Sequence, residues 1–195
     1  MNITIEADGK EFTFRALTED EISTLEDKRS LLKAGKNINL YDDGAEEIKK
    51  ALVSPSQEEF DLFLNEYPNF IESIHNKLFK LSGYQELQVA KLSDEIKNQY
   101  KFPVIGLKWR LVEDQEEIIL FKKISRQDAM LIRKEMEDND GVFQTKKMKE
   151  RAKILCLDKE KAQEISNKHA SFFIAAGYFL WENTYVKVIE QSEKK

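Results

Sequence analysis

The sequence is poor in the residues that build disulfides and metal sites. Its 195 residues include one cysteine, Cys156, and two histidines, His75 and His169. A single cysteine cannot form an internal disulfide, and a structural zinc site needs several Cys and His ligands at close spacing. We therefore expect no disulfide and no zinc. Cys156 follows Ile154 and Leu155, which indicates a small buried hydrophobe.

Long apolar runs and basic blocks are also missing. The longest apolar stretch, residues 172–181, contains Gly177 and is shorter than the roughly 20 residues that cross a bilayer. Lys and Arg number 31 against 36 for Asp and Glu, and the two signs are interspersed, so the net charge of -5 would repel a phosphate backbone. We expect no membrane span and no nucleic acid partner. The first residues do not form a signal segment, which favours an intracellular protein.

No motif for catalysis, nucleotides or calcium is present. The seven glycines are scattered rather than clustered after a strand, as a phosphate-binding loop requires. Residues 138–141 and 41–44 look like parts of calcium loops, but their twelfth positions would be Lys147 and Lys50, which cannot bind calcium. No pattern sets either histidine beside a nucleophile. We therefore expect a protein without metal or cofactor that is not an enzyme.

The N-terminal part has clear signals for a hairpin followed by helices. Residues 2–17 contain two alternating runs separated by Asp8 and Gly9, and Asp-Gly between alternating strands predicts a tight turn. Thr18 stands three residues before Glu21, which predicts a capping box at a helix start. A second capping box is predicted at residues 56–59.

The same order of elements recurs after residue 103. Phe14 and Leu17 align with Phe121 and Ile124 at an offset of 107 residues (124 − 17), and further along Phe70 aligns with Phe172 at 102 (172 − 70). Recurrence of a hairpin, a cap and an apolar helix indicates duplication. We predict an α+β, mostly helical fold with two repeated units, each a β-hairpin followed by several packed helices. The units would span 1–83 and 103–195, joined by a connecting helix over 84–102.

Aromatic residues are dense near the end of the second unit. Phe172, Phe173, Tyr178, Phe179 and Trp181 surround the whole circumference of one predicted helix, and a helix that is apolar on every side must be buried on every side. Two interpretations stay open: the helix is the central one of its domain, or one of its faces binds a partner. The candidate protein-binding residues are Phe172, Phe173, Tyr178 and Trp181.

Several segments of the first unit resemble a family of viral assembly proteins. Residues 14–21 (FRALTEDE), 51–56 (ALVSPS), 67–70 (YPNF) and 81–83 (LSG) resemble the tail assembly chaperones of tailed bacteriophages. The baseplate hub proteins of contractile-tailed phages look similar in outline. The resemblance implies a protein-binding factor in phage tail or baseplate morphogenesis, whose partners are other tail proteins such as the tape-measure or hub proteins. It would act in the cytoplasm of the bacterial host or remain in the tail or baseplate.

Two other functions are compatible with the composition. The chain could be a small enzyme whose site has no linear motif. It could also be a host-directed phage protein that inhibits a bacterial enzyme by presenting an acidic face. A conserved polar cleft would favour the first of these alternatives.

Overall fold

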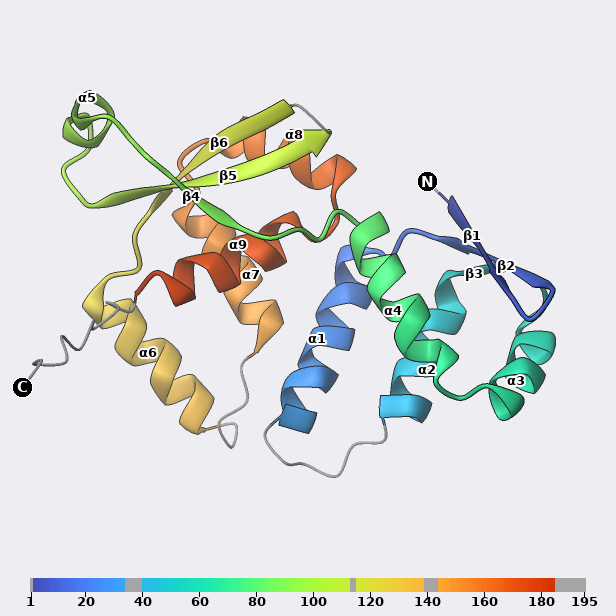
Figure 1. Ribbon diagram of the computed structural model, residues 1–195. Helices are drawn as coiled ribbons and strands as arrows, with labels where there is room; N and C mark the ends of the chain where they lie inside the picture. The colour runs from blue at the N-terminus through green and yellow to red at the C-terminus, as the bar shows by residue number, and fades with distance from the viewer. Residues whose placement is uncertain (1, 34–39, 113–114, 139–143, 185–195) are drawn as a thin grey trace, which may run out of the picture.

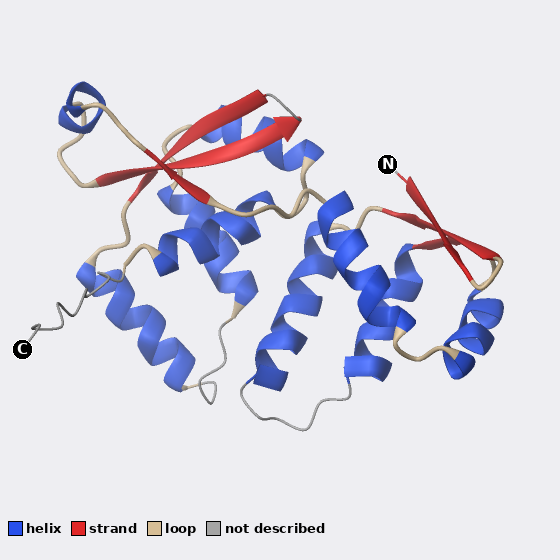
Figure 2. Cartoon of the chain, viewed as in Figure 1, coloured by secondary structure: helices blue, strands red, loops and turns tan. Residues whose placement is uncertain are grey.

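The protein folds as two α+β units that follow one another along the chain (Figure 1). The computed structural model describes residues 2–33, 40–112, 115–138 and 144–184. Each unit has a three-stranded antiparallel sheet accompanied by helices (Figure 2). The predicted fold class, α+β with two repeated units of a β-hairpin followed by packed helices, is confirmed.

The first unit begins with a hairpin and ends with two helices. Its elements in chain order are β1 (Asn2–Ala7), β2 (Lys10–Arg15), α1 (Glu19–Lys33), α2 (Leu40–Ala51), β3 (Leu52–Ser54), α3 (Gln57–Glu66) and α4 (Phe70–Leu81). The strand order is β1-β2-β3, so β1 and β3 are the two edges of the sheet.

The hairpin between β1 and β2 turns at the two residues that the sequence indicated. Asp8 has φ 47° and Gly9 has φ 71°. Positive φ at both central positions is typical of the two-residue turn whose twist matches a hairpin, and it favours Asp and Gly. The closing pair is Ala7 with Lys10. This turn sets the register of the whole hairpin.

Both predicted capping boxes of the first unit are present. The backbone N–H of Thr18 donates to the Glu21 carboxylate at 2.8 Å, and the N–H of Glu21 donates to the Thr18 hydroxyl at 3.3 Å. Ser56 and Glu59 cap α3 in the same reciprocal way. These bonds satisfy donors that have no partner inside the helix.

The Glu21 carboxylate also makes two hydrogen bonds with Arg15, at 2.7 and 2.8 Å. The bonds with Arg15 are the main reason why the pKa of the Glu21 carboxyl falls from its ordinary 4.5 to about 2. A lowered folded-state pKa means that the stabilisation is complete above pH 4.5 and is lost as the pH falls toward 2. We expect Glu21→Gln to flatten the decline of stability between these pH values, measured by urea unfolding at a series of pH. An equally steep decline in the variant would contradict this assignment.

The second unit repeats the order of the first. Its elements are β5 (Val104–Val112), β6 (Gln115–Lys122), α6 (Arg126–Glu137), α7 (Thr145–Leu155), α8 (Lys159–Lys168) and α9 (Phe172–Glu182). Ser125 and Asp128 form a capping box at α6, as Thr18 and Glu21 do before α1. In the first unit β3 pairs with Phe14 of β2. At the corresponding place in the second unit, the backbone of Cys156 forms a single β-bridge with Phe121.

The predicted connecting helix over 84–102 is wrong. This segment contains a short strand, β4 (Gln88–Ala90), and a one-turn helix, α5 (Asp94–Asn98), capped by the hydroxyl of Ser93. β4 pairs antiparallel with β5 and becomes the third strand of the second sheet. The segment has only a thin apolar stripe, so a helix here would gain little from packing. Its backbone forms hydrogen bonds with the edge of β5 instead.

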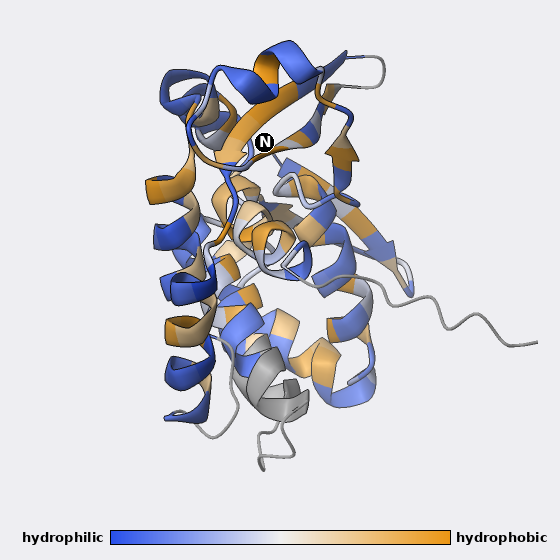
Figure 3. Ribbon diagram, turned by 90° about the vertical axis from the view of Figure 1, so that its left-hand side faces the viewer, coloured by the Kyte–Doolittle hydropathy of each residue, from blue (hydrophilic) through white to orange (hydrophobic). Residues whose placement is uncertain are grey.

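Each unit has its own apolar core, formed between its sheet and its helices. Both sheets and helices carry alternating hydrophilic and hydrophobic bands (Figure 3). The first core contains Phe12, Phe14, Phe60, Phe63 and Ile74, with the second-unit residue Ile174 among them. The second core contains Leu107, Trp109, Phe121, Phe172 and Phe179. The two cores therefore meet at α9.

Hydrogen bonds and ion pairs join the two units beside α9. The Asp27 carboxylate of α1 accepts from the backbone N–H of Thr145 at 2.7 Å. Thr145 is the first residue of α7, whose own N-cap residue makes no side-chain cap bond. The buried Lys149 lies 3.5 Å from Glu19 and 3.4 Å from Asp20. Helix α1 of the first unit thus supplies a cap for the N-terminus of α7 in the second unit. Its carboxylates also offset the charge of Lys149 on α7.

We expect Asp27→Ala to lower the free energy of unfolding by about 1 kcal/mol, because a helix N-terminus then loses its carboxylate cap. Chemical denaturation followed by circular dichroism measures the change. The matched control is Asp94→Ala, since the Asp94 side chain is 89% exposed. Equal stability of the two variants would show that the bond between α1 and α7 contributes nothing.

Candidate protein-binding surface

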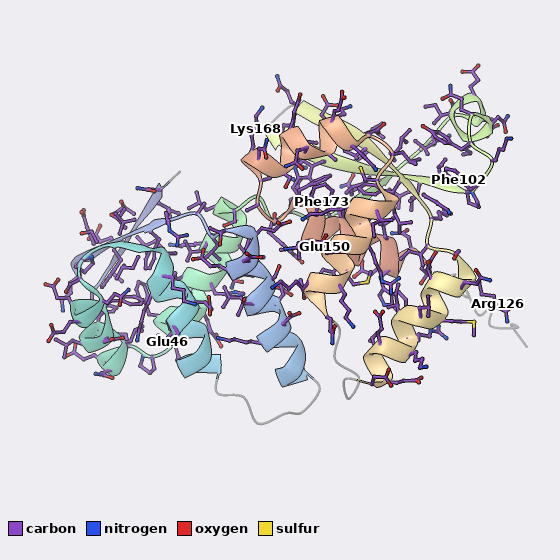
Figure 4. All side chains as sticks on the ribbon, turned by 180° about the vertical axis from the view of Figure 1, so that it is seen from behind. Glu46, Phe102, Arg126, Glu150, Lys168 and Phe173 are labelled. Carbon is purple, nitrogen blue, oxygen red and sulfur yellow. The ribbon has the colours of Figure 1, made fainter. Side chains whose placement is uncertain are left out.

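The four aromatic residues predicted to bind a partner do not form a surface together. Phe172 is 0% exposed and Phe173 is 4% exposed, and Figure 4 labels Phe173 on the second unit. The ring of Phe172 lies 4.9 Å from that of Trp109. Tyr178 and Trp181 are partly buried, and the Tyr178 hydroxyl is 2.9 Å from that of Thr145. Phe172 and Phe173 are therefore core residues, which corrects their prediction as protein-binding residues.

The residues that could carry chemistry are occupied in packing. His75 stacks on Phe79 at 4.3 Å, and His169 lies edge-on to Trp109 at 5.9 Å. Burial, followed by the charge of Lys168, lowers the pKa of His169. Cys156 is buried, and burial raises the pKa of its thiol to about 11, which makes it a poor nucleophile.

The structure offers no metal cluster and no membrane-spanning helix in the parts that it describes. Within residues 2–33, 40–112, 115–138 and 144–184, no three His, Cys, Asp or Glu side chains are placed to hold a metal ion together. In the same segments, every helix is too short or too polar to cross a membrane. The loop considered for calcium at 138–141 lies mostly outside the described residues.

The outer edge of β1, meaning the side of Asn2–Ala7 that faces away from β2, is the candidate site. Among the residues described, no strand pairs with this side. Ala7 and Lys10 close a two-residue hairpin and form a hydrogen-bonded pair, and such pairs alternate along antiparallel strands. The backbone N–H and C=O groups of Thr4 and Glu6 therefore point to the outer edge. They form a template for an additional strand.

The corresponding edge of the second unit is filled. β4 pairs Gln88 with Lys108 and Ala90 with Gly106 along the outer side of β5. Further along the same side, the Gln85 side-chain amide bonds both the N–H and the C=O of Arg110, at 2.9 Å each. The duplicated architecture thus has a place for one more strand, which the chain fills in its second copy.

A surface hollow lies beside the end of β1. It has a volume of about 440 Å³ and is lined chiefly by the hairpin tip and by the junction of α3 and α4: Ala7, Asp8, Phe63, Glu66, Tyr67, Pro68 and Phe70. We call it the Ala7 hollow. Aromatic rings with a strand edge beside them are the combination with which proteins bind extended segments, because the edge gives affinity and the hollow gives specificity.

Both faces of the hairpin carry acidic side chains near the hollow. Asp8 and Glu66 line the hollow itself. Glu6 and Glu11 lie directly opposite one another on β1 and β2, on the other face of the sheet. The Tyr67 hydroxyl donates to the Asp8 carboxylate at 2.7 Å, and this bond raises the pKa of Tyr67. Lys10 lies over the ring of Phe63 at 5.5 Å. Like charges opposite one another destabilise a strand pair, so a cation from a partner would be favourable beside Glu6 and Glu11, on the face away from the hollow.

The sequence indicated the hairpin but not its free edge. Whether a strand has a neighbour on its far side depends on segments that are distant in the chain, and the pattern of residues 84–102, which contain β4, predicts a helix. Ala7 gave no signal of its own, since a small residue before a turn is ordinary. The useful signal was the internal repeat, which places Ala7 and Trp109 at the same position of their hairpins once the strand registers are known.

Comparison with known proteins gives no relative: no family model matches the sequence, and no curated protein or solved structure is significantly similar to it. The fold and the site together define a duplicated α+β protein with an open sheet edge in its first unit.

Proposed function

We propose that this chain is a protein-binding factor rather than an enzyme, and that it takes part in the tail or baseplate morphogenesis of a tailed bacteriophage. It acts as an assembly chaperone or as a structural component. The observation that carries the binding role is the outer edge of β1, whose counterpart in the second unit is covered by β4. The resemblance of residues 14–21, 51–56, 67–70 and 81–83 to tail assembly chaperones supports the setting.

The partners in this proposal are other tail proteins, such as the tape-measure or hub proteins, and neither nucleic acid nor a membrane. The net charge of -5 with interspersed signs supports the exclusion of nucleic acid. A chaperone would work in the cytoplasm of the bacterial host and keep apolar helices of its partner soluble. A structural component would remain in the tail or baseplate.

The test combines affinity capture with mass spectrometry of purified particles. Tagged wild-type chain and Thr4→Pro are expressed in cells that produce the phage. Proline at position 4 removes an outward N–H and leaves the backbone hydrogen bonds between β1 and β2 intact, although the 3.0 Å bond between the Thr4 and Thr13 hydroxyls is lost. The wild type is expected to capture a tail protein, and the variant is expected to lose most of it.

Thr4→Val is the matched control, because it retains the N–H and a β-branched side chain. Presence in the particle at a fixed copy number identifies a structural component, and absence from the particle together with capture of a tail protein identifies a chaperone. The proposal fails if the wild type captures no tail protein and is also absent from particles.

A further inference from the structure

The two hairpins differ in two features at the same place. In the second unit β4 covers the outer edge of β5. The indole of Trp109, near the end of β5, is fully buried on the inner face of the sheet. In the first unit the outer edge of β1 is open, and the Ala7 hollow lies under the end of the strand. Figure 1 shows the hairpin of the first unit at the N-terminus and the labelled strands β4, β5 and β6 of the second sheet.

Trp109 and Ala7 occupy equivalent positions. Trp109 pairs with Glu117 as Ala7 pairs with Lys10, and Trp109 is 0% exposed. Its ring contacts Phe172, which aligns with Phe70 at an offset of 102 residues (172 − 70).

His169 also lies beside Trp109, with its ring 5.9 Å away, and it aligns with Tyr67 at the same offset. Both Phe70 and Tyr67 line the Ala7 hollow. The hollow therefore lies at the place that corresponds to the indole of the second unit, and the first unit has alanine at the equivalent position 7.

The second unit also shows which side chain of an added strand faces this place. β4 pairs Val89 with Leu107, so Leu87, two residues earlier, falls opposite Trp109 on the same face. Leu87 packs against the second core. In the first unit the matching residue of an added strand lies opposite Ala7, and its side chain faces the hollow.

Building on the protein-binding role proposed above, we propose that the outer edge of β1 binds an extended segment of a partner protein. The segment pairs antiparallel with Thr4, Ile5 and Glu6, in the register that β4 uses on β5. It places a large apolar side chain, aromatic or leucine, in the Ala7 hollow, and a lysine or arginine opposite Glu6.

Charge decides between a partner segment and a second copy of this chain. Two β1 strands paired antiparallel about a two-fold axis at Ile5 would place Glu6 opposite Thr4 of the second copy, which brings no cation to Glu6 and Glu11. At the position of Glu6 the second unit has Lys108, whose ammonium lies 3.6 Å from Glu116. A basic residue in the segment supplies the cation that the first hairpin lacks.

The probe is a synthetic peptide of residues 85–92 that carries Leu87→Trp and Gln88→Lys. It is titrated into the isotope-labelled full chain, and amide chemical shifts are recorded. Saturable shifts are expected at Thr4 and Glu6, with slower hydrogen exchange of their outward N–H groups. In Ala7→Trp, which fills the hollow from within, the affinity is expected to fall at least tenfold.

Two controls separate specific binding from damage to the fold. Ala7→Trp should retain the wild-type circular dichroism, and Thr4→Pro should also abolish binding while Thr4→Val retains it. A peptide with Leu87→Ser should bind at least tenfold more weakly. Shifts confined to other residues, or equal affinity of wild type, Ala7→Trp and Thr4→Pro, would overturn the proposal.

Sedimentation of the chain alone tests the second copy. A concentration-dependent dimer that Thr4→Pro abolishes would assign the edge to self-association and overturn the partner segment. Failure of the proposed function is distinguishable from failure of this inference. Peptide binding at Thr4 without capture of a tail protein sinks the function alone, whereas capture that Thr4→Pro leaves unchanged sinks the inference alone.

Discussion

Phe172→Ala is expected to lower the free energy of unfolding by about 3–5 kcal/mol, because it removes a large buried ring and leaves a cavity. Phe172 is 0% exposed and lies 4.9 Å from the ring of Trp109 and 5.0 Å from that of Phe173. The interior is close-packed, so the neighbouring rings relax only partly into the space. Urea unfolding followed by circular dichroism measures the change.

Met130→Ala is the control for this variant. Met130 lies on α6 and is 63% exposed, so its loss should change the free energy of unfolding by no more than about 0.5 kcal/mol. If the two variants were equally stable, Phe172 would not be a core residue, and the interpretation of α9 as a partner-binding helix would return.

Gly83→Ala is expected to lower the free energy of unfolding by about 2–5 kcal/mol, the sum of backbone strain and a steric clash. Gly83 has φ 90°, a conformation that side chains disfavour. An added Cβ would also lie 2.5 Å from Nδ1 of His169, in the second unit. Thermal and chemical unfolding measure the loss, and the clash should loosen the junction between the units.

Gly9→Ala isolates the backbone part of this effect. Gly9 has φ 71°, and nothing lies within 4 Å of an added Cβ. We expect a loss of about 1–2 kcal/mol for this control, from the backbone conformation alone. A loss at Gly83 no larger than the loss at Gly9 would show that His169 moves away at little cost.

Local signals explain why much of the fold could be predicted. Asp8 and Gly9 adopt positive φ in the turn, and Thr18 with Glu21 forms its capping box, because both structures are decided by a few neighbouring residues. The predicted repeat of hairpin and helices is present for the same reason, since each element is set by its own periodicity.

Non-local pairing explains where prediction failed. The segment 84–102 has some apolar spacing of a helix, yet Gln88–Ala90 forms a strand because the outer edge of β5 lies beside it. Strand formation depends on the neighbouring strand more than on the segment itself. The aromatic helix left two interpretations open for a similar reason: its own residues require burial, but they do not specify what covers them.

The sequence by itself determined the turn of the first hairpin, the helix caps, the duplicated order of elements and the small number of groups able to do chemistry. Each of these depends on residue type and short spacing. Only the tertiary structure decided that Phe172 and Phe173 are core, that Asp27 of one unit caps α7 of the other, and that β1 keeps an open edge beside the Ala7 hollow. These features depend on which distant segments pack together. The small size of Ala7 becomes informative only when the structure shows that the equivalent residue of the second unit is Trp109.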